Sequence, residues 1–181
     1  MHLFASIYLE GLYLTDAGRK LTWCMYPGHD GQYTPILDSF VTMISRQFHE
    51  YYLPELIQRH TEAIRSSSAR SRRQTLNMDN QLQTIQLNPV MREKITKRSM
   101  IVIDDFTTQG FGFETARNFL FNAGAESVTC IAVGKYPKPY IARYPKDGIT
   151  WDSFMPVSLT ENDFAFNTVR SIINDQALRF F

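Results

Sequence analysis

Residues 100–112 read M-I-V-I-D-D-F-T-T-Q-G-F-G, and this stretch decides the expected fold. Its apolar start follows the basic pair Lys97 and Arg98, a pattern typical of a short strand buried on both faces. Two carboxylates, Asp104 and Asp105, come next, and a loop with glycines follows them. In a parallel α/β sheet, ligands bind outside the carboxyl ends of the strands. The order of strand, acidic pair and glycine loop therefore predicts a ligand site.

A helix is expected directly after the glycine loop. Apolar side chains recur at helical spacing from Phe113 onward, and Gly124 stands where a left-handed C-terminal cap belongs. The following run, residues 127–133, is apolar and rich in β-branched side chains, which predicts a second buried strand. Strand, helix and strand in this order form a βαβ unit with parallel strands and a right-handed crossover.

The rest of the chain predicts further elements of the same kind. Residues 21–26 are rich in strand formers and are expected to form the first strand of the central sheet. Helices are expected over residues 35–48, after a Thr-Pro start signal, and over residues 53–64. A further strand is expected within residues 82–87, while residues 1–14 fit either a strand or a helix.

These elements predict an α/β fold with a mainly parallel, doubly wound sheet and flanking helices. Residues 1–181 are expected to form one domain, because no repeat or long linker divides the chain. The core is expected at about residues 20–140, and residues 141–181 are expected to be an extension with a helix that starts at Thr160. A chain of this length buries about 70% of the surface of its unfolded form, so it needs no metal or disulfide for stability.

Composition excludes several classes of protein. A net charge of +1 supplies no general attraction for nucleic acid or an anionic membrane, so any anion must be bound locally. The cysteines, Cys24 and Cys130, lie in apolar runs and are expected to be buried, reduced thiols. No window reaches the roughly 18 apolar residues of a membrane helix, and the amino terminus carries Glu10 in place of a basic signal region. A soluble, cytoplasmic protein without membrane contact is expected.

The stretch at 100–112 resembles the signature of the type I phosphoribosyltransferases, in which a short hydrophobic strand leads to two acidic residues and a Thr-rich glycine loop. The resemblance covers about residues 20–140 and is sharpest over residues 98–134. It implies that Asp104 and Asp105 hold the ribose hydroxyls of phosphoribosyl pyrophosphate, directly or through Mg²⁺. It also implies that the 5′-phosphate is bound by the loop residues Thr107, Thr108, Gln109, Gly110, Phe111 and Gly112.

Two loop positions depart from the family pattern. Gln109 stands where the family has Thr or another small residue, and Gly112 stands where it has a hydroxyl residue, so this loop offers fewer hydroxyl donors. A purely structural interpretation also stays open. In that interpretation, Asp104 and Asp105 cap the following helix, and the glycines Gly110 and Gly112 form its turn.

The resemblance implies a pyrophosphate loop after the first strand. Residues 28–33 occupy that place, and Gly28 and His29 are the expected ligand contacts. The loop lacks the Lys or Arg of many family members, and Asp30 would oppose an anion unless a metal intervened. The alternative for His29 is a turn histidine in water.

The resemblance also implies a flexible, basic loop that closes over the site. The arginine-rich segment 66–73 precedes the signature strand and fits this role, because arginine forks match phosphate oxygens. Arg70 and Arg73 are expected to bind pyrophosphate, and Arg72 is expected to act in catalysis. The alternatives are a solvated loop, or a modest contact with nucleic-acid phosphates.

One residue is expected to contact the acceptor base. Tyr136 follows the strand at 127–133, where family members often place residues that stack on the base. The alternative is a rigid edge loop built from the tyrosines and prolines that follow residue 134.

Two functions follow from the resemblance. The first is a Mg²⁺-dependent phosphoribosyltransferase that binds phosphoribosyl pyrophosphate or a nucleotide and transfers phosphoribose to or from a nucleobase-like acceptor. The second is a non-catalytic sensor or assembly subunit, alone as a homo-oligomer or with a partner protein, in a nucleic-acid-linked or phage-defence system. The long basic stretch before the signature resembles the competence-associated and phage-defence-associated members, and the departures at Gln109 and Gly112 favour the second function.

Overall fold

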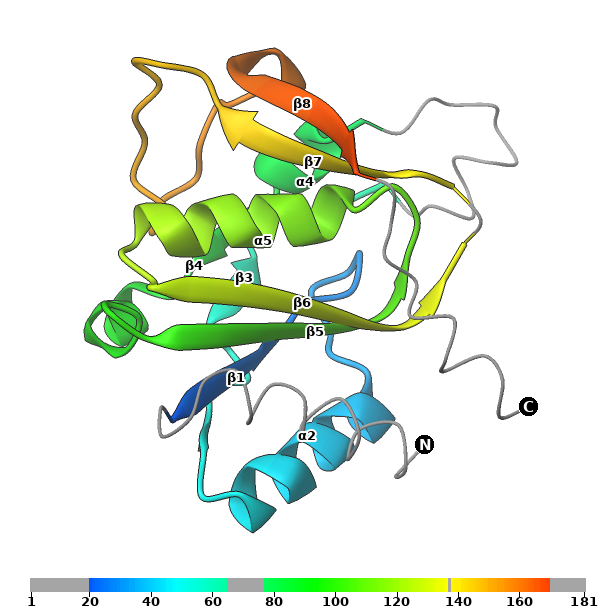
Figure 1. The fold of residues 1–181 in the computed structure, drawn as a ribbon, viewed down its shortest axis with the longest axis vertical. Helices are drawn as coiled ribbons and strands as arrows, with labels where there is room; N and C mark the ends of the chain where they lie inside the picture. Colours follow the sequence, from blue (N-terminus) through cyan, green and yellow to red (C-terminus); the bar gives the residue numbers. More distant parts are fainter. Residues whose placement is uncertain (1–19, 65–76, 137, 170–181) are drawn as a thin grey trace.

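A computed structural model describes residues 20–64, 77–136 and 138–169, shown as coloured ribbon in Figure 1. The strands are β1 (Leu21–Met25), β2 (Tyr51–Tyr52), β3 (Ile57–Arg59), β4 (Ile85–Leu87), β5 (Ser99–Thr107), β6 (Ser127–Lys135), β7 (Tyr140–Pro145) and β8 (Phe164–Val169). The helices are α2 (Pro35–Gln47), α4 (Asp79–Leu82) and α5 (Phe111–Asn122), and the 3-10 turns are η1 (Pro89–Lys94) and η2 (Glu161–Asp163). The predictions for 1–14 and 66–73 lie outside the described residues.

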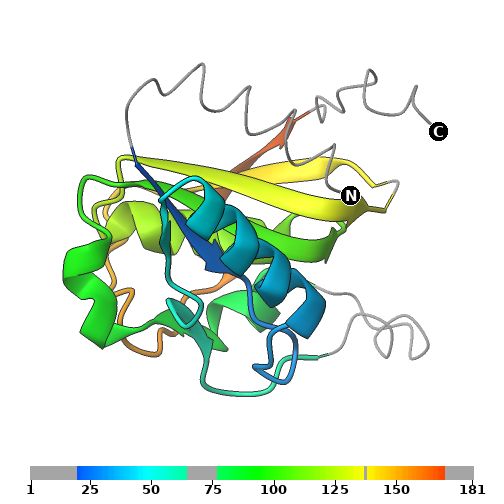
Figure 2. The same cartoon turned by 90° about the horizontal axis from the view of Figure 1, so that it is seen from below.

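The centre of the molecule is a four-stranded sheet in the order β2-β1-β5-β6, and each neighbouring pair is parallel. Helix α5 covers one face, and α2 covers the other face (Figures 1 and 2). Two small antiparallel sheets, β3-β4 and β7-β8, complete the described part. The predicted α/β class, with a parallel central sheet and flanking helices, is confirmed.

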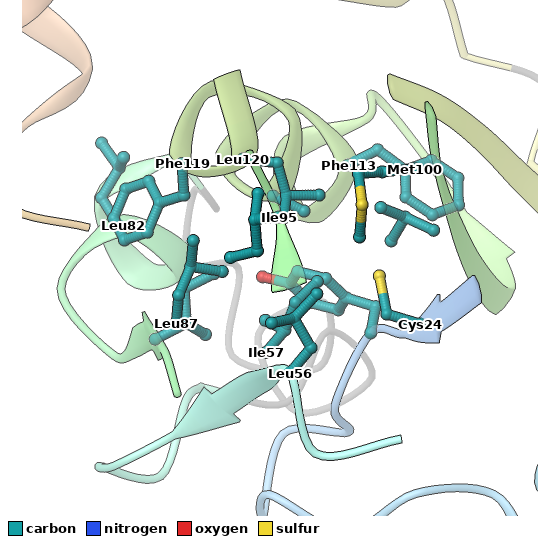
Figure 3. Close-up of a cluster of buried hydrophobic side chains, with 14 of the residues drawn as sticks. Cys24, Leu56, Ile57, Leu82, Leu87, Ile95, Met100, Phe113, Phe119 and Leu120 are labelled. Carbon is teal, nitrogen blue, oxygen red and sulfur yellow. The ribbon is translucent and has the colours of Figure 1, made fainter. Parts of the chain in front are cut away.

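The core explains why residues 100–103 form part of β5, a strand with a neighbour on each side. Side chains alternate between faces along a strand, so Met100 and Val102 join the cluster beneath α5, while Ile101 and Ile103 join the cluster beneath α2. All of them are buried, as expected for a strand covered on both faces. Figure 3 shows the first cluster, in which Phe119 and other α5 side chains meet residues from β1, β3 and β4.

The helix predicted over residues 53–64 is wrong. Strand β3 (Ile57–Arg59) lies there, paired antiparallel with β4 (Ile85–Leu87). The physical reason is tertiary, because Leu56, in the bend before β3, and Ile57, the first residue of β3, are both fully buried in the core beneath α5. The strand predicted within 82–87 is shorter than expected, since Leu82 ends helix α4 and pairing begins at residue 85.

The helix predicted from Thr160 is also wrong over residues 164–169. Thr160 forms the expected capping box with Asp163, but only the short turn η2 follows it. The chain then extends as β8 and pairs antiparallel with β7, and Phe164 is buried in the core beneath α5. Pairing with β7 prevails over the helical spacing of the apolar residues. Residues 170–181 lie outside the described part.

Both cysteines are free thiols: Cys24 is buried and Cys130 is partly buried. Burial raises the pKa of both thiols, for Cys130 to about 12, so each is protonated near neutral pH. Among the described residues, no helix combines the length and the apolar character required to cross a membrane.

Candidate functional site

The acidic pair lies at the carboxyl edge of the sheet. Strand β5 is nine residues long and continues past the predicted end, so Asp104 and Asp105 lie within the strand instead of after it. Pairing with β6 continues on one side, where Asp104 is opposite Ala132. On the other side, β1 ends at Met25, opposite Ile103. The two carboxylates therefore extend beyond the end of β1, where a ligand can approach them.

The two carboxylates differ in their surroundings. Burial raises the pKa of Asp104 well above its ordinary value, and the neighbouring charge of Asp105 raises this pKa further. The Asp105 N–H donates to Asp104 Oδ1 (2.8 Å), and the Phe106 N–H donates to Asp105 Oδ1 (2.6 Å). Within the described residues, neither carboxylate forms an ion pair. A cation or a hydroxyl donor at this edge would offset the unfavourable charge on Asp104.

The loop after the acidic pair is shorter than expected. Thr107 is the last residue of β5, Thr108 and Gln109 form the turn, and Gly110 precedes the helix with a left-handed φ of 86°. Helix α5 then begins at Phe111, so Phe111 and Gly112 belong to its first turn. The first backbone N–H groups of a helix have no partner within the helix and carry partial positive charge. They lie at the same edge of the sheet as Asp104.

Both glycines allow an aromatic ring to approach the backbone closely. A Cβ on Gly110 would lie 2.3 Å from Tyr140 Cε2, and a Cβ on Gly112 would lie 2.9 Å from Tyr26 Cε1. The sequence alone supported two uses for these glycines, a phosphate loop and a helix turn. Their positions in the structure are explained first by the packing of Tyr26 and Tyr140.

A buried polar network fixes Tyr140 against the loop. Its hydroxyl donates to Glu114 Oε1 (2.6 Å), and Glu114 is only 2% exposed. Glu114 also accepts from the Arg143 N–H (2.6 Å) and pairs with Arg117. This network attaches β7 to the first turn of α5.

The loop after β1 satisfies its own donors. The Gly28 N–H donates to the Gln32 carbonyl (2.8 Å), so this amide is not available to a pyrophosphate. His29 Nδ1 lies 4.0 Å from Asp30 Oδ1, and its Nε2 lies 4.0 Å from Glu62 Oε1. An anion beside His29 would meet two carboxylates. The segment that was expected to bind pyrophosphate follows β1, but its Gly28, Gly31 and Gln32 N–H groups donate to acceptors within the loop.

Arg59 is a site residue that the sequence analysis missed. Its Nε donates to the Gly28 carbonyl (2.7 Å), its Nη2 donates to Gln81 Oε1 (2.9 Å), and its guanidinium lies 5.8 Å from the centre of the Tyr26 ring. Its charge also acts on Asp104, where it lowers the pKa against the larger effect of burial. The segment was interpreted as a helix, which would not bring Arg59 to the loop after β1.

An exposed aromatic pair lies where the base was expected. The rings of Tyr136 and Phe106 have centroids 5.8 Å apart and are tilted by 42°. Phe106 is 58% exposed and is paired in register with Gly134, where a Cβ would lie 2.2 Å from the Phe106 ring. Gly134 thus makes room for Phe106, a residue that the sequence analysis did not assign to the site.

The described residues bring together the acidic pair, the turn at 108–110, the start of α5 and Arg59. Arg70, Arg72 and Arg73 lie outside the described residues. Across the part of the chain that the structure describes, no group of three or more His, Cys, Asp or Glu side chains could hold a metal ion.

These features define an α/β protein with a parallel sheet and a candidate anion and hydroxyl site at its carboxyl edge. The chain matches no protein-family model and no curated protein sequence.

Proposed function

We propose that this protein binds a phosphorylated ribose, as phosphoribosyl pyrophosphate or a nucleotide, at the carboxyl edge of β1, β5 and β6. The observation that supports the proposal best is the pair Asp104 and Asp105 at the same sheet edge as the first turn of α5. A sugar phosphate has hydroxyl donors at one end and an anion at the other. Carboxylates and free backbone N–H groups match these two ends. A type I phosphoribosyltransferase-like form of the α/β fold is part of the same proposal.

The acidic pair would hold the ribose hydroxyls. An ionised carboxylate accepts strongly from a hydroxyl group, and the unfavourable charge on Asp104 would be offset by such donors. Mg²⁺ fits the same donor set, because it binds through one or two carboxylates and takes its other ligands from phosphates and water. Asp104 and Asp105 are the residues that would hold it. When bound, Mg²⁺ would neutralise charge on the pyrophosphate.

The turn and the helix start would hold the 5′-phosphate. Thr108 and Gln109 supply a hydroxyl and an amide, and residues 111–113 supply N–H groups of the first helical turn. The Gln109 carbonyl accepts from the Ile141 N–H (3.1 Å), which directs this acceptor away to β7. The anion would thus meet donors on one side of the turn.

The transfer reaction would exchange a bond at ribose C1′. The bond to the pyrophosphate oxygen would break, a bond to a nucleobase nitrogen would form, and that nitrogen would lose its proton. Positive charge develops on the sugar in this reaction, so Asp104 and Asp105 near the ring would stabilise it. The pair Phe106 and Tyr136 offers an exposed aromatic surface for the base.

A non-catalytic sensor of the same ligand is the second candidate. The loop after β1 favours it, because the Gly28 N–H is used internally and His29 lies near two carboxylates. Arg59 donates to protein acceptors through all of its donor nitrogens, Nε, Nη1 and Nη2. Binding of ribose and its 5′-phosphate needs none of these groups, whereas departure of a pyrophosphate does.

Calorimetry with phosphoribosyl pyrophosphate and Mg²⁺ tests the proposal. We expect saturable binding by the wild type and a loss of at least tenfold in affinity in Asp104→Asn/Asp105→Asn. Asp147→Asn, an exposed aspartate in the turn after β7, is the control and should bind like the wild type. No binding by the wild type would exclude both candidates. Binding without pyrophosphate release across a panel of nucleobases would favour the sensor.

A further inference from the structure

A polar hollow lies at the edge of the sheet opposite the acidic pair, where β1, β5 and β6 begin. In Figure 1 these strands run from left to right, so this amino edge is on the left and the carboxyl edge is on the right. The hollow is open, has a volume of about 520 Å³, and is lined by Lys20, Thr96, Lys97, Arg98, Ser99 and Glu126. Pockets for small ligands have volumes of about 300–1,000 Å³.

The lining concentrates positive charge. Lys20, Lys97 and Arg98 contribute three cations, against the single carboxylate of Glu126. Two of the cations share one aromatic ring, because the Arg98 guanidinium lies 4.6 Å and the Lys20 ammonium 5.6 Å from the centre of the Tyr51 ring. Cations held this close repel one another, and a bound anion would offset the repulsion.

The backbone holds these side chains in a defined turn. Lys97 has a left-handed φ of 58°, which is uncommon for a residue other than glycine. Its N–H donates to the Gly124 carbonyl (2.8 Å), and the Arg98 carbonyl accepts from the Glu126 N–H (3.0 Å). These two hydrogen bonds connect the segment before β5 to the segment before β6. One lies at Lys97 and the other at Arg98.

A buried donor lines the same hollow. Ser99 is 4% exposed, and among the described residues its hydroxyl has no hydrogen-bond partner. Buried hydroxyl groups nearly always have a partner, so Ser99 supplies an unused donor among the residues that line the hollow. This observation is independent of the charge of the lining.

We propose that this hollow binds the phosphate group of a small phosphate monoester. Several donors around one centre suit a tetrahedral oxyanion, since the Arg98 fork can hold two oxygens while Lys20 and Lys97 act as point charges. Glu126 opposes a longer chain of phosphates and favours a ligand with one phosphate. The site is separate from the acidic pair, so it stands whether or not phosphoribosyl pyrophosphate binds at the carboxyl edge.

Inorganic phosphate is the probe for the test, followed by backbone NMR. We expect saturable shifts of the amide signals of residues 96–99 in the wild type. Lys97→Gln/Arg98→Gln should weaken this binding at least tenfold, whereas Lys138→Gln/Lys146→Gln, which removes the same charge elsewhere, should leave it unchanged. Glu126→Gln should strengthen binding by a few fold, because it removes the opposing charge.

Ser99→Ala provides a second test that removes no charge. We expect weaker phosphate binding by a few fold, with an unchanged fold, because the substitution removes a buried hydroxyl that lacks a partner. Shifts that increase without saturation, or that weaken equally in both double variants, would overturn the proposal and leave only a cationic surface. Shifts confined to residues 108–113 would place phosphate at the carboxyl edge and would also overturn it.

Discussion

The loops after β5 and after β1 lie at the same edge of the sheet but use their polar groups differently. Asp104 and Asp105 lie in β5 just before the first loop and form no ion pair within the described residues, and this loop leads directly into the first turn of α5. The loop after β1 uses its Gly28 N–H internally, and Arg59 binds its carbonyls. We propose that the first loop is arranged for an external ligand, whereas the second loop is bonded to itself and to Arg59. We therefore propose a site that binds ribose phosphate well and handles pyrophosphate poorly.

The largest expected effect is on the loop after β5. Gly110→Ala should destabilise the protein by about 3 kcal/mol, through left-handed backbone strain and overlap with the Tyr140 ring. That ring cannot move away easily, because its hydroxyl is bonded to buried Glu114. Gly148→Ala is the matched control, since Gly148 has a φ of 81° and no neighbour within 4 Å. It should cost only about 1 kcal/mol.

Urea unfolding of the two variants measures this difference. Equal losses of stability in Gly110→Ala and Gly148→Ala would show that Tyr140 does not restrict the loop. The packing explanation for Gly110 would then be incorrect.

The next effect concerns the loop after β1. Arg59→Met should reduce stability by about 2 kcal/mol, because it removes the charged donor that bonds to both the Gly28 carbonyl and Gln81 Oε1. Hydrogen exchange should become faster in residues 27–33 and stay unchanged in residues 108–113. Arg92→Met is the control, because Arg92 forms an exposed ion pair with Asp152 and should cost less than about 1 kcal/mol. Equally faster hydrogen exchange in residues 27–33 and 108–113 would contradict the claim that Arg59 stabilises only the loop after β1.

A smaller effect separates binding from stability at the acidic pair. The raised pKa of Asp104 means that the folded protein favours its protonated form. Its contribution to stability is therefore complete below the ordinary aspartate pKa of 3.8 and is lost as the pH rises through the higher pKa of the folded state. Asp104→Asn should raise the melting temperature at pH 7 by roughly 2–4 °C, equivalent to about 1 kcal/mol.

The gain in Asp104→Asn should disappear in acid, where both side chains are neutral. The same variant should bind phosphoribosyl pyrophosphate more weakly. A lower melting temperature at pH 7 would show that Asp104 is stabilised by its surroundings and not poised for a cation.

The smallest expected effect comes from removing negative charge beside the loop after β1. Asp30→Asn/Glu62→Gln removes both carboxylates beside His29 and should strengthen pyrophosphate binding by a few fold. Calorimetry with pyrophosphate and Mg²⁺ measures the change, with Asp147→Asn as the control. An unchanged affinity would show that these carboxylates do not limit the loop.

The two strands and the helix of the βαβ unit were predictable from sequence. The apolar run before Asp104 is buried on both faces, as predicted. The β-branched run at 127–133 forms a strand as predicted, but this strand lies at the edge of the described sheet and is only partly buried, with Val133 55% exposed. The cap at Gly124 is a local signal, confirmed by its φ of 93°. The segments at 57–59 and 164–169 were mistaken for helices. Their apolar residues fit helical spacing, but pairing with β4 and β7 decides their conformation, and such long-range pairing is not visible in a local pattern.

The candidate site was predictable only in part, because a local pattern shows only residues that are close together in the sequence. Asp104, Asp105 and Gly110 lie together in the chain, so a local motif indicates them. Arg59 reaches Gly28, 31 residues away, and Tyr140 reaches Glu114, 26 residues away. These contacts depend on how β3 and β7 pack against the sheet.

A crystal structure with phosphoribosyl pyrophosphate and Mg²⁺ tests the central claim most directly. The account predicts ribose hydroxyls or Mg²⁺ on Asp104 and Asp105, and the 5′-phosphate on the N–H groups of residues 111–113. Density for the ligand elsewhere on the molecule, with the carboxyl edge bound only to water, would contradict it.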